Sequence, residues 1–402
     1  MKILLINQVF YPDCVSTAQH LTDLALYLVS HGHEVTVLCG NRAYADEKKK
    51  YSKFEVYRKI NIHRVSYFPV RKNGKIPRIV SSVSFILTAI GKLLFTNKQD
   101  VVICLTSPPL IGLAAVLFSR LKGAKCVEWV MDLNPDEAIA AGWIQSDSLL
   151  TVWLRRMTRF IFRSSQKIIV LDQFMKERLA ASGVPENKIQ IISPWAHDAT
   201  VHPVNHEENH FRKQYQLENK FVVMYSGNHS LCHPLDTLLG VALRLRNEPA
   251  ILFYFIGGGA RICDVRDFKL KHGLDHIIQL DYQPMEGLSE SLSAADLHVV
   301  TMGDEFVGMG HPCKIYDILA VGRPFIFIGP SKSHIGEIVC EHRIGYHVEH
   351  GNIDGLVQII QKVRTLRIEE KAEILRTSMS IINNKFSQKK MCETIENLIQ
   401  QI

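Results

Sequence analysis

The sequence predicts an α/β protein of two domains. A chain of 402 residues is longer than one hydrophobic core usually serves, so we expect two domains of somewhat under about 200 residues each. Short apolar runs typical of buried strands alternate with segments of helical periodicity in both halves of the chain. This alternation predicts two doubly wound, Rossmann-like α/β/α domains, residues 1–198 and 199–386, with a polar, histidine-rich linker up to Lys213.

The first domain opens with a β-α-β unit. Residues 1–6 and 34–38 are apolar strand candidates, and the segment 16–31 between them carries apolar residues at helical spacing and ends at Gly32. The loop after the first strand lies where doubly wound sheets bind ligands. It lacks the GxGxxG pattern, so we expect no dinucleotide cofactor.

A group of carboxylates follows a later strand of the same domain. Residues 124–130 form a strand candidate, and Asp132, Asp136 and Glu137 come directly after it. The carboxyl ends of parallel strands are where active sites form, so the group is a candidate site. The alternative is that Asp132 caps the helix that begins after Pro135.

The most informative stretch is residues 301–329, TMGDEFVGMGHPCKIYDILAVGRPFIFIG. The strand Leu297–Thr301 runs into a glycine loop, and Phe325–Ile328 begins another strand. Between them we expect a short helix, with Pro312 in its first turn and Gly322 at its end.

Lys314 lies in the first turn of that helix, where its charge opposes the helix dipole. Together with the free N–H groups of the helix start, Lys314 favours an anion. Asp317 lies three residues later on roughly the same face and can accept hydrogen bonds from hydroxyls. The pair therefore predicts a site for phosphates and a diol, as in a nucleotide, unless it is an ordinary solvated pair on a surface helix.

This stretch resembles the donor loop of retaining GT-B glycosyltransferases of family 4, and within that family the branch that includes colanic-acid and O-antigen N-acetylfucosamine transferases. The residues that fit the pattern are Pro312, Lys314, Ile315, Tyr316, Ile318, Leu319, Ala320, Gly322, Arg323 and Pro324. The resemblance covers nearly the whole chain and is specific mainly at residues 312–324 and 130–137. It implies the GT-B fold, in which the two domains face each other across a cleft and a C-terminal helix, residues 387–402, returns to the first domain.

The resemblance also implies an activity. We expect a metal-independent, retaining transfer of a hexosyl or N-acetylhexosaminyl unit from a nucleotide sugar, UDP-linked, to a glycan or lipid-linked acceptor in surface polysaccharide synthesis. No cofactor and no metal ion is expected. A non-hydrolysing sugar-nucleotide epimerase and a catalytically silent donor-fold subunit stay open as alternatives.

The resemblance further implies roles for individual residues. Lys314 would hold the pyrophosphate and Asp317 the ribose, while Gly308, Met309 and Gly310 would contact the sugar. Asp132 stands where many relatives carry a histidine near the reacting carbon, so it would stabilise the oxocarbenium-like centre or take the acceptor proton. Many relatives have a second acid at the position of Met309, and Glu305 is a candidate substitute.

Four positions depart from the family pattern around the donor phosphates. Val15 and Ser16 replace a Gly-Gly pair, so the Ser16 hydroxyl and the helix start would serve instead. Asn228 and His233 stand where relatives carry Arg and Lys. The phosphates would then depend on Lys314, on backbone N–H groups around Gly227 and on a protonated His233.

Composition and charge limit which partners and which cellular compartment we expect. The net charge is +7 and the pI is about 8.8, which favours an acidic partner, but no tract of Arg and Lys with interleaved aromatics predicts nucleic-acid binding. The nine cysteines are scattered without a CxxC pair, which is typical of reduced thiols and not of a zinc site. The N-terminus lacks the features of a signal peptide, so we expect a cytoplasmic protein.

One segment has the composition of a membrane-associated helix. Residues 79–95 are apolar but interrupted by polar residues and too short to cross a bilayer comfortably, and the basic run 71–78 precedes them. The segment is either a buried core helix or an interfacial helix that rests on anionic lipid, on the inner face of the plasma membrane.

Overall fold

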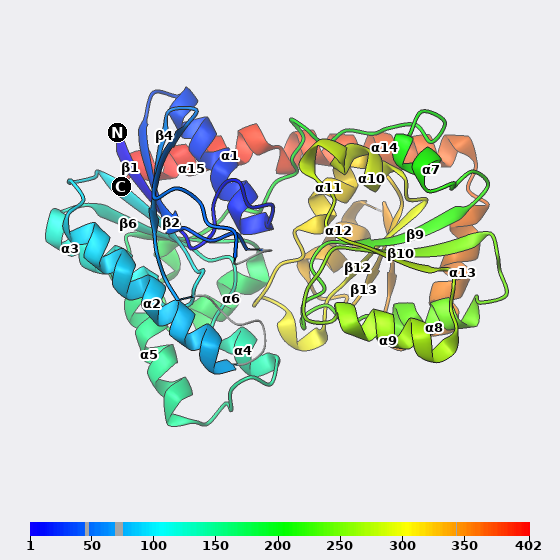
Figure 1. Ribbon diagram of the computed structural model, residues 1–402, viewed down its shortest axis with the longest axis horizontal. Coiled ribbons are helices and arrows are strands. Elements are labelled where there is room, and N and C mark those ends of the chain that lie inside the picture. Colours follow the sequence, from blue (N-terminus) through cyan, green and yellow to red (C-terminus); the bar gives the residue numbers. More distant parts are fainter. Residues whose placement is uncertain (45–47, 69–74, 343) are drawn as a thin grey trace. The chain divides into compact units, whose positions relative to one another are not determined.

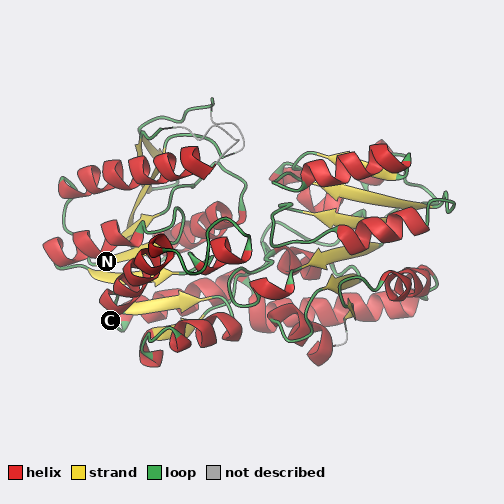
Figure 2. Ribbon diagram, turned by 90° about the horizontal axis from the view of Figure 1, so that it is seen from below, coloured by secondary structure: helices red, strands yellow, loops and turns green. Residues whose placement is uncertain are grey.

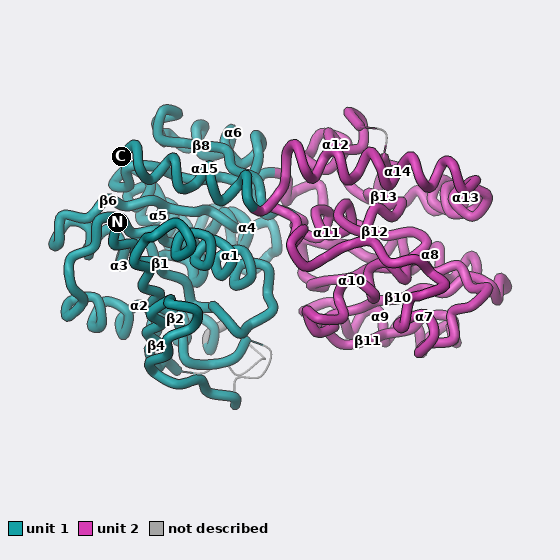
Figure 3. The backbone as a smooth tube through the Cα atoms, turned by 90° about the horizontal axis from the view of Figure 1, so that it is seen from above, with its two compact units in different colours: residues 1–194, 308–311, 389–402 teal, residues 195–307, 312–388 magenta. Residues whose placement is uncertain are grey.

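Each half of the chain is built around one mainly parallel β-sheet with helices on both faces (Figures 1 and 2). The computed structural model describes residues 1–44, 48–68, 75–342 and 344–402. These residues form two compact units, coloured separately in Figure 3. Unit 1 contains Met1–Pro194, Gly308–His311 and Lys389–Ile402, and unit 2 contains Trp195–Val307 and Pro312–Gln388.

Unit 1 has an eight-stranded sheet in the order β3-β4-β2-β1-β5-β6-β7-β8, in which only β3 runs antiparallel to its neighbour. The strands are β1 (Lys2–Ile6), β2 (Glu34–Gly40), β3 (Phe54–Tyr57), β4 (Ile60–Val65), β5 (Val101–Leu105), β6 (Lys125–Trp129), β7 (Lys167–Val170) and β8 (Ile189–Ile191). The helices are α1 (Ser16–Ser30), α2 (Lys75–Leu94), α3 (Gly112–Lys122), α4 (Asp136–Ala140), α5 (Leu149–Ser164), α6 (Gln173–Ala181) and α15 (Gln388–Gln400).

The strands at the centre of this sheet are continuous apolar runs because both of their faces are covered. All five residues of β5 are buried, as are Ile3, Leu4, Leu5 and Ile6 of β1. The edge strand β3 instead alternates between exposed and half-buried side chains. Sequence analysis found the central strands and missed β3 and β4, whose alternation with polar residues leaves no continuous apolar run.

Unit 2 has a six-stranded, fully parallel sheet in the order β11-β10-β9-β12-β13-β14. The strands are β9 (Phe221–Ser226), β10 (Ile251–Ile256), β11 (Ile277–Leu280), β12 (Leu297–Thr301), β13 (Phe325–Ile328) and β14 (Gly345–Val348). The helices are α7 (His210–Gln214), α8 (Asp236–Arg244), α9 (Ile262–His272), α10 (Leu288–Ser293), α11 (Lys314–Val321), α12 (His334–His342), α13 (Ile353–Arg364) and α14 (Ile368–Ile381).

The strand order of unit 2 reverses between β9 and β12. From β9 the chain proceeds to β10 and β11 on one side, and β12 leads to β13 and β14 on the other side. The connections that leave these two strands therefore diverge to opposite sides, which opens a crevice at their carboxyl ends. Ligands bind at this switch point in open α/β sheets, so the loops after β9 and β12 are where a site is expected.

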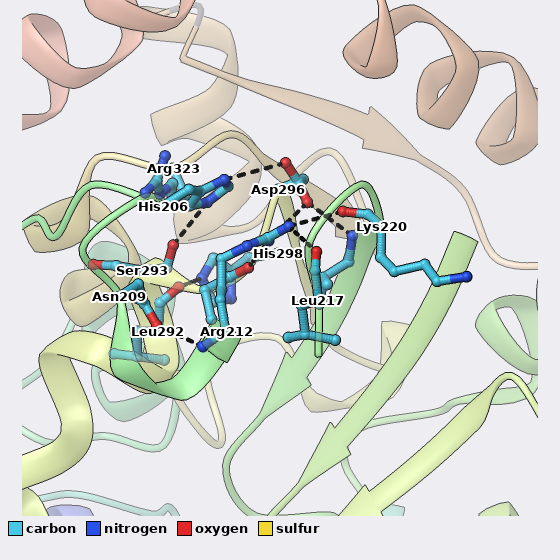
Figure 4. Close-up of polar contacts among 12 residues, drawn as sticks. His206, Asn209, Arg212, Leu217, Lys220, Leu292, Ser293, Asp296, His298 and Arg323 are labelled. Carbon is cyan, nitrogen blue, oxygen red and sulfur yellow. Dashed lines mark hydrogen bonds and ion pairs between the residues drawn. The ribbon is translucent and has the colours of Figure 1, made fainter. Parts of the chain in front are cut away.

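The polar segment that was predicted as a linker is pinned to unit 2 by a buried arginine (Figure 4). Arg212 of α7 donates to the carbonyl oxygens of Ala294, Leu217 and Lys220, and its guanidinium lies 3.3 Å from the carboxylate of Asp296. The same carboxylate accepts the N–H of Val222 in β9. Removing one member of such a buried pair costs about 3–5 kcal/mol, so this network fixes where unit 2 begins.

The helix of the glycine-rich stretch begins later than predicted. α11 starts at Lys314, and Pro312 lies outside it, one residue before the N-cap Cys313. A tight turn, in which Ile315 N–H donates to Pro312 O at 3.3 Å, precedes the helix. The predicted end is confirmed, because Gly322 closes the helix at φ +62°, where a Cβ would clash with Leu375.

Helix α2 differs from the buried core helix that was one of the two expectations. Phe85, Ala89 and Leu93 are buried, but Val83 and Leu87 on the opposite side are exposed. Among the described residues, Pro77–Leu94 is the one helix long and apolar enough to cross a membrane, judged by length and composition alone. The residues Arg71 and Lys72 of the basic run lie outside the described residues.

Candidate active site

The first cluster lies in unit 2, at the switch point of its sheet. Lys314 is the first residue of α11, and its ammonium nitrogen is buried 3.7 Å from the centre of the Tyr225 ring in β9. Within the described part of the chain this nitrogen has no hydrogen-bond partner. The ring face attracts the cation, but burial without an acceptor lowers the pKa of Lys314 to about 7. An anion bound next to Lys314 would therefore stabilise its charged form.

Glycines shape the backbone beside Lys314. Gly227 has φ +128°, and a Cβ there would lie 3.3 Å from Cε of Lys314. Gly257 and Gly259 have φ +120° and +137°, and Cβ atoms on them would clash with the Gly227 carbonyl and with Asn228. These positions require glycine because a side chain would be strained and would also collide. The loop after β9 is thus held against the loop after β10, and its backbone is open next to the ammonium group.

His233 cannot supply the positive charge that sequence analysis assigned to it. It is buried, and its Nδ1 lies 2.6 Å from the carbonyl oxygen of Thr301, to which it donates. Burial and the nearby Lys314 charge lower the pKa of His233 well below its usual value, and burial lowers the pKa of His229 to about 4. Both imidazoles are neutral at pH 7, so the expectation of a protonated His233 was wrong.

Asp317 lies one turn beyond Lys314 and already has a partner that the sequence did not reveal. Its Oδ1 accepts the backbone N–H of His197 at 3.0 Å and lies 3.0 Å from the His197 Nδ1. The side chain of Asp317 is 18% exposed. Oδ2 of Asp317 also lies 3.1 Å from the His197 Nδ1, so the contact with His197 orients the Asp317 carboxylate.

The second cluster lies in unit 1, after β6. The N–H groups of Met131 and Asp132 both donate to the hydroxyl oxygen of Thr106, at 3.1 and 3.2 Å. Leu133 N–H donates to the Met309 carbonyl at 2.7 Å, and a Cβ on Gly310 would lie 3.9 Å from Oδ1 of Asp132. The glycine loop Gly308–His311 therefore packs against the segment that carries Asp132.

A buried histidine and carboxylate complete this cluster. Nδ1 of His311 lies 2.8 Å from Oδ2 of Asp172, while the other oxygen of Asp172 accepts the N–H of Met175 at the start of α6. Asp172 thereby fixes the ring of His311, whose charge acts to lower the pKa of Asp132. Sequence analysis missed both residues. The one available signal was the position of His311 directly after the glycine loop.

Burial raises the pKa of the carboxyl groups around Asp132. The pKa of Asp132 is raised to about 6, with His311 opposing the shift, and the pKa of Glu137 is raised to about 8 by burial and by the charge of Asp132. Glu128 in β6 is buried and its pKa is raised well above the usual value. Asp132, Asn134 and Glu128 line one small pocket. Carboxyl groups that titrate near neutral pH are suited to proton transfer.

The structure thus groups the predicted site residues into two sets. Gly227, Asn228, His233, Lys314 and Asp317 lie in unit 2, and Asp132, Gly308, Met309 and Gly310 lie in unit 1. Two candidates lie outside these contacts. Ser16 is the first residue of α1, with its hydroxyl 3.2 Å from Nδ1 of His20, and Glu305 is exposed on the 3₁₀ turn Asp304–Phe306 of unit 2. No group of three or more metal-ligating side chains occurs among the described residues.

Glu137→Gln tests whether this carboxyl is as strongly perturbed as its surroundings indicate. A folded-state pKa of about 8, above the unfolded value, means that the folded protein holds a proton which the unfolded chain releases. Stability is then lost as the pH rises from about 4.5 through 8. The amide cannot ionise, so Glu137→Gln should be more stable than wild type by a few kcal/mol, as an order of magnitude, at pH 9 and similar to it at pH 4.

Denaturant unfolding at the two pH values measures this difference. The matched control is Glu177→Gln, at an exposed position of α6. It should leave the free energy of unfolding unchanged at both pH values. If the free energy of unfolding of the wild type falls no more steeply with pH than that of Glu137→Gln, Glu137 ionises normally.

Two family models match the chain one after the other. The model described as "Glycosyltransferase Family 4" matches residues 17–200, and the model described as "Glycosyl transferases group 1" matches residues 207–379. Among curated proteins, WbjE of Pseudomonas aeruginosa, named as a glycosyltransferase, is 26% identical over 292 residues, which is 73% of this chain and 72% of that protein. WcaI of Escherichia coli K12, whose name assigns it to colanic acid biosynthesis, is 22% identical over 379 residues, 91% of this chain and 93% of that protein.

Solved structures of glycosyltransferases have the same fold. The sucrose-phosphate synthase of Thermosynechococcus elongatus superposes with a TM-score of 0.78, at 14% identity, over 100% of this chain and 98% of that chain. HepE of Anabaena, solved with UDP and glucose, gives a TM-score of 0.75 at 14% identity over 100% of both chains. The two successive family models together with these likenesses confirm the predicted GT-B fold of two Rossmann-like domains, and the chain belongs to the family 4 glycosyltransferases.

Proposed function

We propose that the protein transfers a hexose or an N-acetylhexosamine-type sugar, with retention, from a UDP-linked donor to a glycan or lipid-linked acceptor in surface polysaccharide synthesis. The observation that carries the proposal is the buried ammonium group of Lys314. It lies without an acceptor at the start of α11, beside the open backbone of Gly227, at the switch point of the sheet.

A diphosphate would supply the anionic acceptor that the ammonium group of Lys314 lacks. An anion next to Lys314 would be bound by a charge-assisted hydrogen bond, by the positive end of the α11 dipole and by the backbone after β9. The neutral His229 and His233 shape the site without competing for the anion. Solved structures of HepE contain UDP or UDP-glucose, which supports a uridine nucleotide as the donor here.

The other donor contacts follow from the same helix. Asp317, which His197 orients, is assigned to the ribose hydroxyls as a hydrogen-bond acceptor. Asn228 follows Gly227 on the exposed side of the loop, and Ser16 at the start of α1 offers a hydroxyl and free N–H groups. Glu305, together with the loop that contains Met309, is assigned to the sugar.

Asp132 is assigned to the reacting carbon. Transfer of a glycosyl group develops positive charge on the sugar ring, and a carboxylate in a buried site stabilises that charge strongly. With a pKa of about 6, Asp132 is ionised at pH 7 but remains close to the point at which it accepts a proton. We place the enzyme in the cytoplasm, where nucleotide sugars are available to it.

Asp132→Asn tests this role against a panel of nucleotide sugars. We expect the wild-type enzyme to hydrolyse one UDP-sugar slowly without acceptor, and Asp132→Asn to lower that rate on the order of 100-fold while donor affinity changes little. The matched control is Asp136→Asn, since Asp136 lies in the same segment but is paired with Arg155.

Two outcomes would contradict the assignment. If Asp132→Asn keeps its turnover, Asp132 has only a structural role. If an epimer is released from the donor in the absence of any acceptor, the protein is an epimerase.

Lys314→Met separates phosphate binding from nucleoside binding. Deleting a charge-assisted hydrogen bond worth about 1.5–3 kcal/mol should weaken the binding of uridine diphosphate roughly 10- to 150-fold. The affinity for uridine, which has no phosphate, should stay unchanged. Asp317→Asn should instead weaken both ligands, because both carry the ribose diol. Calorimetric titration measures all four affinities.

The exposed Lys271→Met on α9 is the charge-matched control for Lys314→Met and should bind both ligands like wild type. If Lys314→Met binds the diphosphate as tightly as wild type, the phosphates bind elsewhere.

A further inference from the structure

Three neighbouring helices of unit 1 expose large apolar side chains. α2 packs beside α3, and α3 packs beside α5, over the sheet of unit 1 (Figure 1). We define the apolar surface as the exposed residues Val83, Leu87 and Leu94 of α2, Leu121 of α3, and Leu149 and Trp153 of α5.

α2 is apolar on two opposite sides. Phe85, Ala89 and Leu93 recur every fourth residue and are buried, so this side packs into unit 1. Val83 and Leu87 form a second row, turned by about half a revolution, and Leu87 is 63% exposed. The side chains of this second row remain exposed after the chain has folded. Large apolar side chains that stay exposed along one side of a helix indicate a contact with a protein or a membrane.

The charge of the three helices is of one sign. None of them contains an Asp or a Glu, and their sequences include nine Lys and Arg. Four of these are in α5, and Arg120 of α3 lies 5.1 Å from the ring centre of Phe160 in α5. Two copies of this chain that joined through the apolar surface would bring these charges together. An anionic partner, in contrast, would neutralise them.

We propose that the apolar surface rests on an anionic membrane, with its apolar side chains at the boundary between headgroups and acyl chains. The arginines extend from the same helices to the lipid phosphates, since their long side chains can reach past apolar neighbours. α2 lies in the plane of this interface and does not cross the bilayer, because its Phe85 side is part of the core of unit 1. The proposal does not depend on sugar transfer, because vesicle binding needs neither donor nor acceptor.

Co-sedimentation of the full chain with vesicles tests the proposal. We expect binding to vesicles of phosphatidylcholine with 30% phosphatidylglycerol, weak binding to pure phosphatidylcholine, and release as the salt concentration rises, because charges at the surface are screened. Removing two cations with Arg156→Gln and Arg163→Gln should weaken binding to the anionic vesicles roughly 5-fold for each charge.

The apolar part is tested by a pair of matched double variants. Leu87→Ser with Trp153→Ser should lower binding on the order of 10-fold or more. The control, Leu270→Ser with Ile368→Ser, changes exposed apolar residues of unit 2, which are 71% and 83% exposed, and should bind like wild type. All four positions are on the surface, so both variants should unfold at the wild-type denaturant midpoint.

Three results would overturn the proposal. Wild-type protein could fail to bind anionic vesicles, or bind neutral and anionic vesicles equally. The unit 2 control could lose as much binding as the unit 1 variant. Finally, sedimentation equilibrium could show that Leu87→Ser with Trp153→Ser converts a dimer to a monomer while vesicle binding is unchanged, which would make the surface a contact between two copies.

Discussion

Burial of one ammonium group against an aromatic ring is the constraint around which unit 2 is arranged. Lys314 lies over Tyr225 in a position where it meets no acceptor, and its pKa is lowered to about 7 as a result. Such an arrangement costs stability in the empty protein. Gly227 and the glycines after β10 keep a side chain out of the space beside it, at the one edge of the sheet where the strand order reverses.

Burial also perturbs the ionisable groups of the unit 1 cluster, but there it disfavours the negative charge of carboxylates. Asp132, Glu137 and Glu128 are carboxyl groups whose pKa burial raises, and His311 acts against that shift at Asp132 only. His311 thereby favours the charged form of Asp132 over that of the two glutamates, which gives Asp132 a role distinct from theirs. Asp172 is important for this difference because it fixes the His311 ring.

Much of this architecture follows from local sequence. Buried parallel strands are continuous apolar runs, which is why β12 and β13 were predicted with the bounds that the structure has. Gly322 ends α11 as expected because only glycine adopts its backbone conformation at low cost. Lys314 and Asp317 were singled out because a basic residue at a helix start and an acid one turn later suit a nucleotide better than they suit the helix.

What the sequence could not show depends on residues that meet only in the folded chain. The charge of His233 was predicted wrongly because nothing near it in sequence reveals its burial beside Lys314. Tyr225, His197 and His311 were missed for the same reason, since their partners Lys314, Asp317 and Asp172 lie far away along the chain. The start of α11 was misplaced because Pro312 suits the turn before the helix as well as the helix itself.

The proposed donor site depends on Lys314 as a buried cation to which a diphosphate would supply the missing acceptor. The most direct measurement is an NMR titration of ¹³C-labelled lysine side chains, with the Lys314 signal assigned from its absence in Lys314→Met, in the free protein and with saturating uridine diphosphate. The account predicts a pKa of about 7 without ligand and a rise of two units or more with it, toward the ordinary lysine value near 10.4. An ordinary pKa in the free protein, or a pKa that the diphosphate leaves unchanged, would contradict it.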